Sequence, residues 1–276
     1  MTLPGGVWTL HGLDRSFAFK PLSGHVELAI AEHWESDVPW PRRITELLTS
    51  ALDLLGGVPA TVETVERLSV GDRQFLLCQL GARLVDDVMW QSQPCSACGE
   101  PLDLPVSYRD FPVKPAGPTY PFAEVQTSAR EQPIRFRVPN GEDELELLAY
   151  SDASTARTVL VERLVAESES PRRWSFSRLD VRAIESAIEE VAPEVGLEGV
   201  ATCPACGHQG SFEFDLYSFG RRASSARLYE EVYRLAHACH WSEDAILKLP
   251  RRRRQTYLGL VDRDRGFQAR HEAFVP

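Results

Sequence analysis

The first part of the chain alternates between short apolar runs and one longer amphipathic run. Residues 7–10, 17–19 and 26–30 are brief, partly alternating apolar stretches, and the pattern predicts a strand at each of them. Between residues 44 and 55 the apolar positions recur at helical spacing instead, and the Gly56-Gly57 pair that follows is typical of a helix C-cap. We therefore expect three strands and then a helix.

The middle of the chain mixes both periodicities. Ser69 is suited to cap a second helix and Asp72 to occupy its first turn. Residues 102–106 alternate with period two, which predicts a strand. Residues 107–132 are rich in proline and polar side chains and predict a long connection, and residues 134–138 predict a further strand.

From residue 142 to 191 the pattern becomes helical and acidic, with Ser177 placed to cap the last of these helices. The carboxylates of this region alternate with arginines, which is typical of a solvated helix face. Beyond residue 226 the tail is again helical. Ser242 is suited to cap a restart, and residues 251–261 predict a third short helix.

Two CxxCG motifs carry the most specific chemical signal in the chain. Their cysteines are Cys95, Cys98, Cys203 and Cys206, and an alternating strand follows each motif. CxxC spacing lets two sulfurs from one tight turn face the same ion, and the glycine that follows accepts a left-handed conformation. Four thiolates form the donor set of closed, structural zinc sites. We therefore predict one structural Zn²⁺ shared by the two motifs, in a split ribbon of two β-hairpin knuckles.

Other interpretations of the cysteines stay open at this point. Each pair is also compatible with a redox dithiol, although neither opens a helix in a βαβ context. His208 follows the second motif and is a substitute ligand or, as we expect, a neighbour of the site. Cys78 and Cys239 fall in apolar helical patterns and are expected in the core. The 104 residues between Cys98 and Cys203 predict an insertion, at about residues 107–196, between the ribbon halves.

Composition and charge narrow the class of protein. The chain is 43% hydrophobic and 25% charged, as globular proteins are. Its net charge of −10 argues against non-specific binding to nucleic acid or to an anionic membrane. No run approaches the roughly 20 apolar residues that span a bilayer, and no secretory signal is recognisable. We expect a cytoplasmic protein in which paired cysteines serve a metal rather than disulfides.

The tail has the opposite charge, because residues 221–276 contain twelve Lys or Arg and seven Asp or Glu. Its densest feature is the run Arg251, Arg252, Arg253 and Arg254, which suggests contacts to phosphates or to an acidic protein surface. We expect His237, His240 and Trp241 to pack at a helix corner. No phosphate-binding glycine loop, HExxH or GxSxG motif occurs, which lowers the expectation of an enzyme.

Three segments together resemble T4-type phage baseplate hub assembly proteins and their relatives from contractile tails and contractile injection systems. The first is LSVGDRQFLL at residues 68–77, continuing to the first CxxCG motif. The second is residues 134–148, followed later by CPACGH at 203–208 and by residues 212–219. The third runs from LYEEV at 228–232 through HWSEDAIL at 240–247 to residues 251–260. The resemblance implies a non-enzymatic protein, and only the four cysteines are carried over residue by residue.

Together these patterns predict an α+β protein with a split four-cysteine zinc ribbon, inserted helices and a helical C-terminal tail. We expect residues 1–60 to form a strand and helix segment, 61–220 the ribbon core and 221–276 a basic tail module. The resemblance implies a structural or chaperone-like assembly role in a baseplate, with other baseplate or hub proteins as partners. The alternative is a zinc-ribbon regulator that binds nucleic acid through the basic C-terminal helices.

Overall fold

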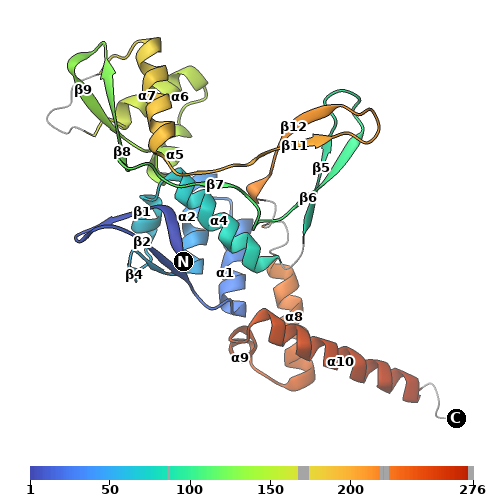
Figure 1. The fold of residues 1–276 in the computed structure, drawn as a ribbon. Coiled ribbons are helices and arrows are strands. Elements are labelled where there is room, and N and C mark those ends of the chain that lie inside the picture. The colour runs from blue at the N-terminus through green and yellow to red at the C-terminus, as the bar shows by residue number, and fades with distance from the viewer. Residues whose placement is uncertain (86–87, 167–173, 218–219, 221–223, 273–276) are drawn as a thin grey trace.

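The computed structural model describes residues 1–85, 88–166, 174–217, 220 and 224–272. Helices and small antiparallel sheets are mixed along the chain, which confirms the predicted α+β class. A central body carries three projections: a lobe of helices and a hairpin, a pair of β-hairpins, and a helical tail (Figure 1).

The N-terminal residues build the central body around a four-stranded antiparallel sheet of order β1-β2-β3-β4. Its elements are β1 (Thr2–Thr9), β2 (Gly12–Phe19), α1 (Gly24–Glu35), α2 (Trp40–Ala51), β3 (Leu52–Leu55), β4 (Val58–Pro59), α3 (Val62–Glu66) and α4 (Val70–Leu84). Ser69 caps α4 as predicted, because its side chain accepts a hydrogen bond from the Asp72 N–H. Helix α4 runs through the middle of the body and packs against β1 (Figure 1).

The strand predicted at residues 26–30 is wrong, because these residues lie inside helix α1. Ser23 caps this helix by accepting from the Val26 N–H, and Glu27 sits in the first turn. A run of five apolar and polar residues is too short to separate a period of two from one of 3.6. The capping serine decides for the helix.

The helix predicted to extend to residue 55 ends earlier, at Ala51. Residues 52–55 form strand β3, in which Leu52 and Leu55 are paired with Phe19 and Phe17 of β2. Gly56 and Gly57 are therefore not a helix cap. They form the two-residue turn between β3 and β4, with φ of 60° and 76°, and consecutive positive φ angles are typical of a type I′ hairpin turn.

The main core crosses the division that we expected near residue 60. Leu3, Leu48, Leu76 and Val106 belong to one buried cluster, which joins the N-terminal sheet, α2, α4 and the base of the first cysteine hairpin. Residues 1–60 thus share their core with the segment that carries the first CxxCG motif.

The segment between the two cysteine hairpins forms the inserted lobe. The chain passes from the central body into this lobe and back through a neck of two short paired strands. The elements in chain order are β5 (Met89–Pro94), β6 (Pro101–Val106), β7 (Val113–Lys114), β8 (Phe122–Thr127), β9 (Arg130–Arg137), α5 (Gly141–Leu147), α6 (Ala153–Arg163), α7 (Arg178–Val191), β10 (Glu194–Val195), β11 (Glu198–Thr202) and β12 (Gln209–Glu213). In the neck, β7 pairs with β10, so Val113 lies opposite Val195. The ends of the lobe are thereby held together although about 80 residues separate them.

The long connection predicted at residues 107–132 is wrong in its second half, because it contains strand β8 and the start of β9. These strands form a hairpin whose apolar side chains pack against α7 in a core of their own. The inserted lobe is thus a hairpin covered by helices, and β9 contains residues 134–137 of the strand predicted at 134–138. The lobe docks closely on the body, since Val70 N–H donates to the Pro139 carbonyl oxygen at 3.1 Å.

The tail consists of α8 (Ser225–Cys239), α9 (Glu243–Leu247) and α10 (Arg251–Glu272). The predicted Ser242 cap is confirmed, whereas α10 is much longer than the short helix expected at residues 251–261. Leu28 of α1 packs against the small tail core. The expected division at residue 220 borders residues 221–223, which lie outside the described residues.

Candidate metal centre

Two β-hairpins carry the CxxCG motifs at their tips. In the first, β5 and β6 pair from Met89 opposite Val106 to Pro94 opposite Pro101. In the second, β11 and β12 pair from Glu198 opposite Glu213 to Thr202 opposite Gln209. The hairpins lie side by side on the same side of the body, although one precedes and the other follows the inserted lobe (Figure 1).

The backbone of the two tips is the same in hydrogen bonding and in conformation. Cys95 N–H donates to the Glu100 carbonyl oxygen at 2.8 Å, and Gly99 N–H donates to the Cys95 carbonyl oxygen at 2.9 Å. In the second tip, Cys203 N–H donates to the His208 carbonyl oxygen at 2.8 Å, and Gly207 N–H to that of Cys203 at 2.9 Å.

The glycine of each tip has a left-handed backbone, with φ of 77° at Gly99 and 71° at Gly207. A Cβ atom at either glycine would meet nothing within 4 Å. The motif therefore needs glycine for backbone conformation and not for space.

The four sulfur atoms converge across the two hairpins. Cys95 Sγ lies 3.8 Å from Cys206 Sγ, and Cys98 Sγ lies 3.7 Å from Cys203 Sγ. All four lie within 4.8 Å of one another. A tetrahedral zinc with Zn–S bonds of about 2.3 Å would separate its sulfurs by about 3.8 Å. The arrangement therefore has the size of a tetrahedral four-thiolate metal site.

Each hairpin contributes one buried and one exposed thiol, which are Cys95 and Cys203 inside and Cys98 and Cys206 outside. Hydrogen bonds from the Cys98 and Ala97 N–H groups lower the pKa of the Cys95 thiol to about 6. The Glu100 N–H also lowers the pKa of Cys98, but the thiol neighbours, chiefly that of Cys206, outweigh it and raise this pKa to about 12. Without a cation, four such close sulfurs therefore cannot all ionise, whereas a divalent metal would stabilise the thiolates.

Two glutamine side chains fasten the first hairpin to the end of the second. Gln91 Nε2 donates to the Asp215 carbonyl oxygen at 2.9 Å, and Gln91 Oε1 accepts from the Asp215 N–H at 3.2 Å. Gln93 Nε2 donates to the Glu213 carbonyl oxygen at 2.7 Å. The glutamines thus join the two hairpins from side chain to backbone, without a strand pairing between them. The sequence pattern held no signal for them.

The other candidate donors do not join the cluster. His208 is exposed, and among the described residues the metal-sized group consists of the four cysteines alone. Cys78 is buried in the main core, where burial raises its pKa to about 12, and Cys239 packs against the tail core. Cys78 therefore lies in the core as predicted, whereas Cys239 is only partly buried at the edge of the tail core.

The arginine run does not form a single surface. Arg254 is fully buried: its Nη2 lies 3.0 Å from Glu27 Oε2 of α1, and its Nε donates to Glu231 Oε2 of α8 at 3.2 Å. Arg251 is half-buried and donates through Nη1 to the Leu84 carbonyl oxygen at 2.7 Å. Two of the four arginines therefore join the tail to the body.

The helix corner of the tail packs only in part as expected, because Trp241 contacts α10 whereas His237 and His240 are exposed. His240 adopts a left-handed conformation, with φ of 55°, at the end of α8. Trp241 stacks edge-on against Tyr257 of α10, with ring centroids 4.9 Å apart.

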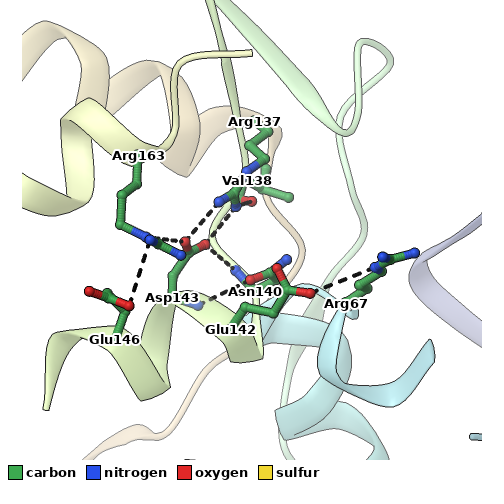
Figure 2. Close-up of polar contacts among 8 residues, drawn as sticks. All are labelled: Arg67, Arg137, Val138, Asn140, Glu142, Asp143, Glu146 and Arg163. Carbon is green, nitrogen blue, oxygen red and sulfur yellow. Dashed lines mark hydrogen bonds and ion pairs between the residues drawn. The ribbon is translucent and has the colours of Figure 1, made fainter. Parts of the chain in front are cut away.

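The acidic region is only partly the solvated face that its pattern predicted, because Asp143 is buried. Arg137 binds it with two hydrogen bonds, of 2.6 and 2.7 Å, and Arg163 Nε approaches at 3.3 Å (Figure 2). Asp143 also forms a capping box with Asn140 at the start of α5. The Asn-x-x-Asp spacing was the signal in the sequence that marks this carboxylate as a helix cap.

Two further buried charges hold the lobe to the body. The Asp72 carboxylate accepts hydrogen bonds from the N–H groups of Gly5 and Gly6 and from the Tyr120 hydroxyl. The Arg73 guanidinium binds Glu144 of α5 at 3.0 Å and the carbonyl oxygen of Pro41 at 2.8 Å, together with two further acceptors on α2 and α3. The side chains of Asp72 and Arg73 thus have hydrogen-bond partners on other helices and strands.

Comparison with protein-family models gave no match, and comparisons with curated proteins and with solved structures gave none either. Over the described residues, no helix combines the length and the apolar character needed to traverse a lipid bilayer.

Proposed function

We propose that Cys95, Cys98, Cys203 and Cys206 bind one Zn²⁺ and that this ion has a structural role, completing a split zinc ribbon. The observation that carries the proposal is the convergence of four thiols, from two matching CxxCG tips, at tetrahedral spacing. Four protein ligands would leave the ion no open position, which is typical of structural rather than catalytic zinc.

The zinc would serve the architecture at a particular place. The chain enters the lobe through β7 and leaves it through β10. In sequence, the cysteine hairpins lie immediately before and after this neck. A shared ion would therefore close the chain around the inserted lobe and fix both hairpins relative to the body. Binding to two distant chain segments makes metal affinity part of the folding free energy.

We further propose a non-enzymatic role as a structural or assembly component of the baseplate of a contractile, phage-tail-like particle. The support is the resemblance of three chain segments to such proteins, together with a form that suits a scaffold. Lobe, hairpins and tail project from one body in different directions (Figure 1). Each of them would offer a separate docking surface. Its partners would be other baseplate or hub proteins.

The metal proposal is tested by mass spectrometric metal analysis of purified protein and of C95S, C203S and C239S. We expect one zinc and no iron per chain, loss of zinc in C95S and C203S, and retention in C239S, which removes a thiol outside the cluster. Iron in place of zinc, or two metals per chain, would contradict the shared zinc site.

The baseplate proposal needs a separate test. The neighbouring genes are first examined for sheath, tube and spike proteins, and the chain is then deleted from that cluster. We expect particles that lack a baseplate in electron micrographs, with rescue by the wild-type chain and not by C95S/C203S. Normal particles, or a gene isolated among metabolic genes, would count against the assembly role while leaving the zinc site untouched.

A further inference from the structure

An open groove lies between the end of α4 and the start of α10. Arg83 of α4 lines one side, and Arg251, Arg252, Gln255 and Thr256 of α10 line the other. Among the described residues that line it there is no carboxylate. The sequence pattern could not have shown this group, because well over a hundred residues separate Arg83 from the arginines of α10.

Two of the guanidinium groups, those of Arg83 and Arg251, are anchored by uncharged groups, whereas Arg252 is exposed. Arg83 lies over the Phe19 ring, with its Cζ 4.8 Å from the ring centroid. Arg251 is tied by one nitrogen to the Leu84 carbonyl oxygen, which leaves its other N–H groups unused by that bond. Arginines positioned in this way lose less conformational freedom when a ligand binds.

A second groove on the tail provides the contrast. It is lined by Arg227 and Arg234 but also by Glu230, Glu231 and Asp262, so its positive charges are balanced within the groove. Behind the groove beside α4, the buried Glu27 forms its direct ion pair with Arg254 and interacts more weakly with Arg251. The first turn of α10 also carries no acidic residue. A helix N-terminus adds partial positive charge on this side.

We propose that the groove formed by Arg83, Arg251 and Arg252 binds phosphate groups. Guanidinium forks match phosphate oxygens in geometry and charge, and the groove has three of them and no carboxylate among its described lining residues. The phosphate has two possible sources, a small free phosphate compound or the phosphodiester backbone of a nucleic acid. The site is separate from the cysteine cluster and does not depend on the metal proposal.

The test uses full-length, metal-loaded protein and inorganic pyrophosphate, titrated by calorimetry at low ionic strength. We expect binding that weakens about tenfold or more in R83A/R252A, since each lost charge-assisted contact is a strong one. R253A is the matched control, because Arg253 is exposed and belongs to the same run but does not line the groove. R83K/R252K keeps the charge without the fork and should bind at intermediate strength. Thermal unfolding and metal content confirm that each variant is folded.

Two further probes separate the sources of phosphate. A single-stranded oligodeoxynucleotide is measured by fluorescence anisotropy, and poly-glutamate serves as the anion without phosphate. Tighter binding of the oligonucleotide than of pyrophosphate, lost in R83A/R252A, would support the site and assign it to a phosphodiester chain. The reverse order would support it and assign a small phosphate. Absence of binding by both phosphate probes, equal loss in R253A, or equally tight binding of poly-glutamate would overturn the proposal.

Discussion

The side-chain amide of Gln91 forms two hydrogen bonds with the backbone of a single residue, Asp215. Its nitrogen donates to the carbonyl oxygen at 2.9 Å and its oxygen accepts from the N–H at 3.2 Å. A side chain thereby replaces the missing strand pairing between the first cysteine hairpin and the chain that leaves the second. This contact joins two hairpins that the whole inserted lobe separates in sequence and whose four cysteines lie close together.

Replacing Gln91 with alanine should lower the free energy of unfolding by about 1–3 kcal/mol, because the partly buried amide and carbonyl of Asp215 lose their partner. Metal should stay bound, since all four cysteines remain. Denaturant unfolding with metal analysis checks both statements. Q126A is the control, because Gln126 binds the Arg130 carbonyl oxygen within its own exposed hairpin. Equal destabilisation by both variants would show that the bond of Gln91 to Asp215 contributes no more to stability than a bond within one exposed hairpin.

The close approach of α4 to the neck predicts that Gly71→Ala is strongly destabilising. A Cβ at Gly71 would lie 1.9 Å from the carbonyl oxygen and 2.6 Å from the carbonyl carbon of Pro193, and both atoms belong to the backbone. The lobe must then shift, at a cost of about 1–3 kcal/mol or more.

Gly259→Ala in α10 is the control, because it makes the same substitution in a helix at a position with free space. Nothing lies within 4 Å of its added Cβ, so relief of the glycine entropy should stabilise by about 0.5–1 kcal/mol. Thermal or denaturant unfolding of both variants measures these two changes in stability. Loss of stability in G71A no larger than about 0.3 kcal/mol would show that the neck yields freely.

Local sequence patterns could predict most of the helices and the cysteine tips, because their signals lie within a few residues. Ser69, Ser177 and Ser242 all cap helices as predicted. Errors arose where a short run fits two periods, as at residues 26–30, or where Gly56-Gly57 suits both a helix end and a hairpin. At residues 26–30 the capping Ser23 favoured the helix, and at Gly56-Gly57 the pairing of β3 with β2 and β4 favoured the hairpin.

The contacts that join distant segments could not be predicted in the same way. The paired CxxCG motifs predicted that their four cysteines would meet, because a closed zinc site needs four ligands and each motif supplies two. No comparable rule links Gln91 to Asp215 or Arg83 to Arg251. A long-range hydrogen bond or a shared groove depends on the packing of whole elements, which side-chain type at single positions does not encode.

Arg254→Met should destabilise the tail and its contact with the body by about 3–5 kcal/mol. The substitution removes the direct ion pair of the buried Glu27, which then keeps the weaker interaction with Arg251, and leaves Glu231 with weaker partners. Burial already raises the pKa of Glu27, and Arg254 opposes that shift. R253A, at an exposed position of the same helix, should change stability by no more than about 0.5 kcal/mol. Circular dichroism with denaturant compares them, and similar curves would contradict a structural role for Arg254.

Asp143 should make stability depend on acid pH. Burial by itself raises its pKa, but the hydrogen bonds and charge of Arg137, with those of Asn140 and Arg163, outweigh burial and hold the pKa below its ordinary value. The unfolded chain then binds the proton more readily, so this contribution is complete above about pH 4 and is lost as pH falls through the folded-state pKa.

The measurement is the unfolding free energy of wild type and D143N from neutral pH down to about pH 2. We expect the destabilisation caused by D143N to shrink as the pH falls, because the wild-type carboxylate is then protonated as well. D53N, which alters an exposed aspartate, should follow the wild-type curve. A difference between D143N and wild type that stays constant with pH would show that the charge of Asp143 contributes nothing to stability.

Gly99→Ala and Gly207→Ala should weaken metal binding without removing a ligand. Both glycines have positive φ and open space around the missing Cβ, so alanine meets a conformational penalty of about 1–2 kcal/mol and no clash. If the tip conformation brings each cysteine pair together, competition with a chelator should show zinc affinity about tenfold lower in either variant. The double variant should lose about as much again, because the two tips contribute separately. Asn at either position tolerates the left-handed region better than alanine and should recover part of the affinity. Equal affinity in wild type and both alanine variants would mean that the sulfur positions are set by the hairpin docking and not by the glycine turns.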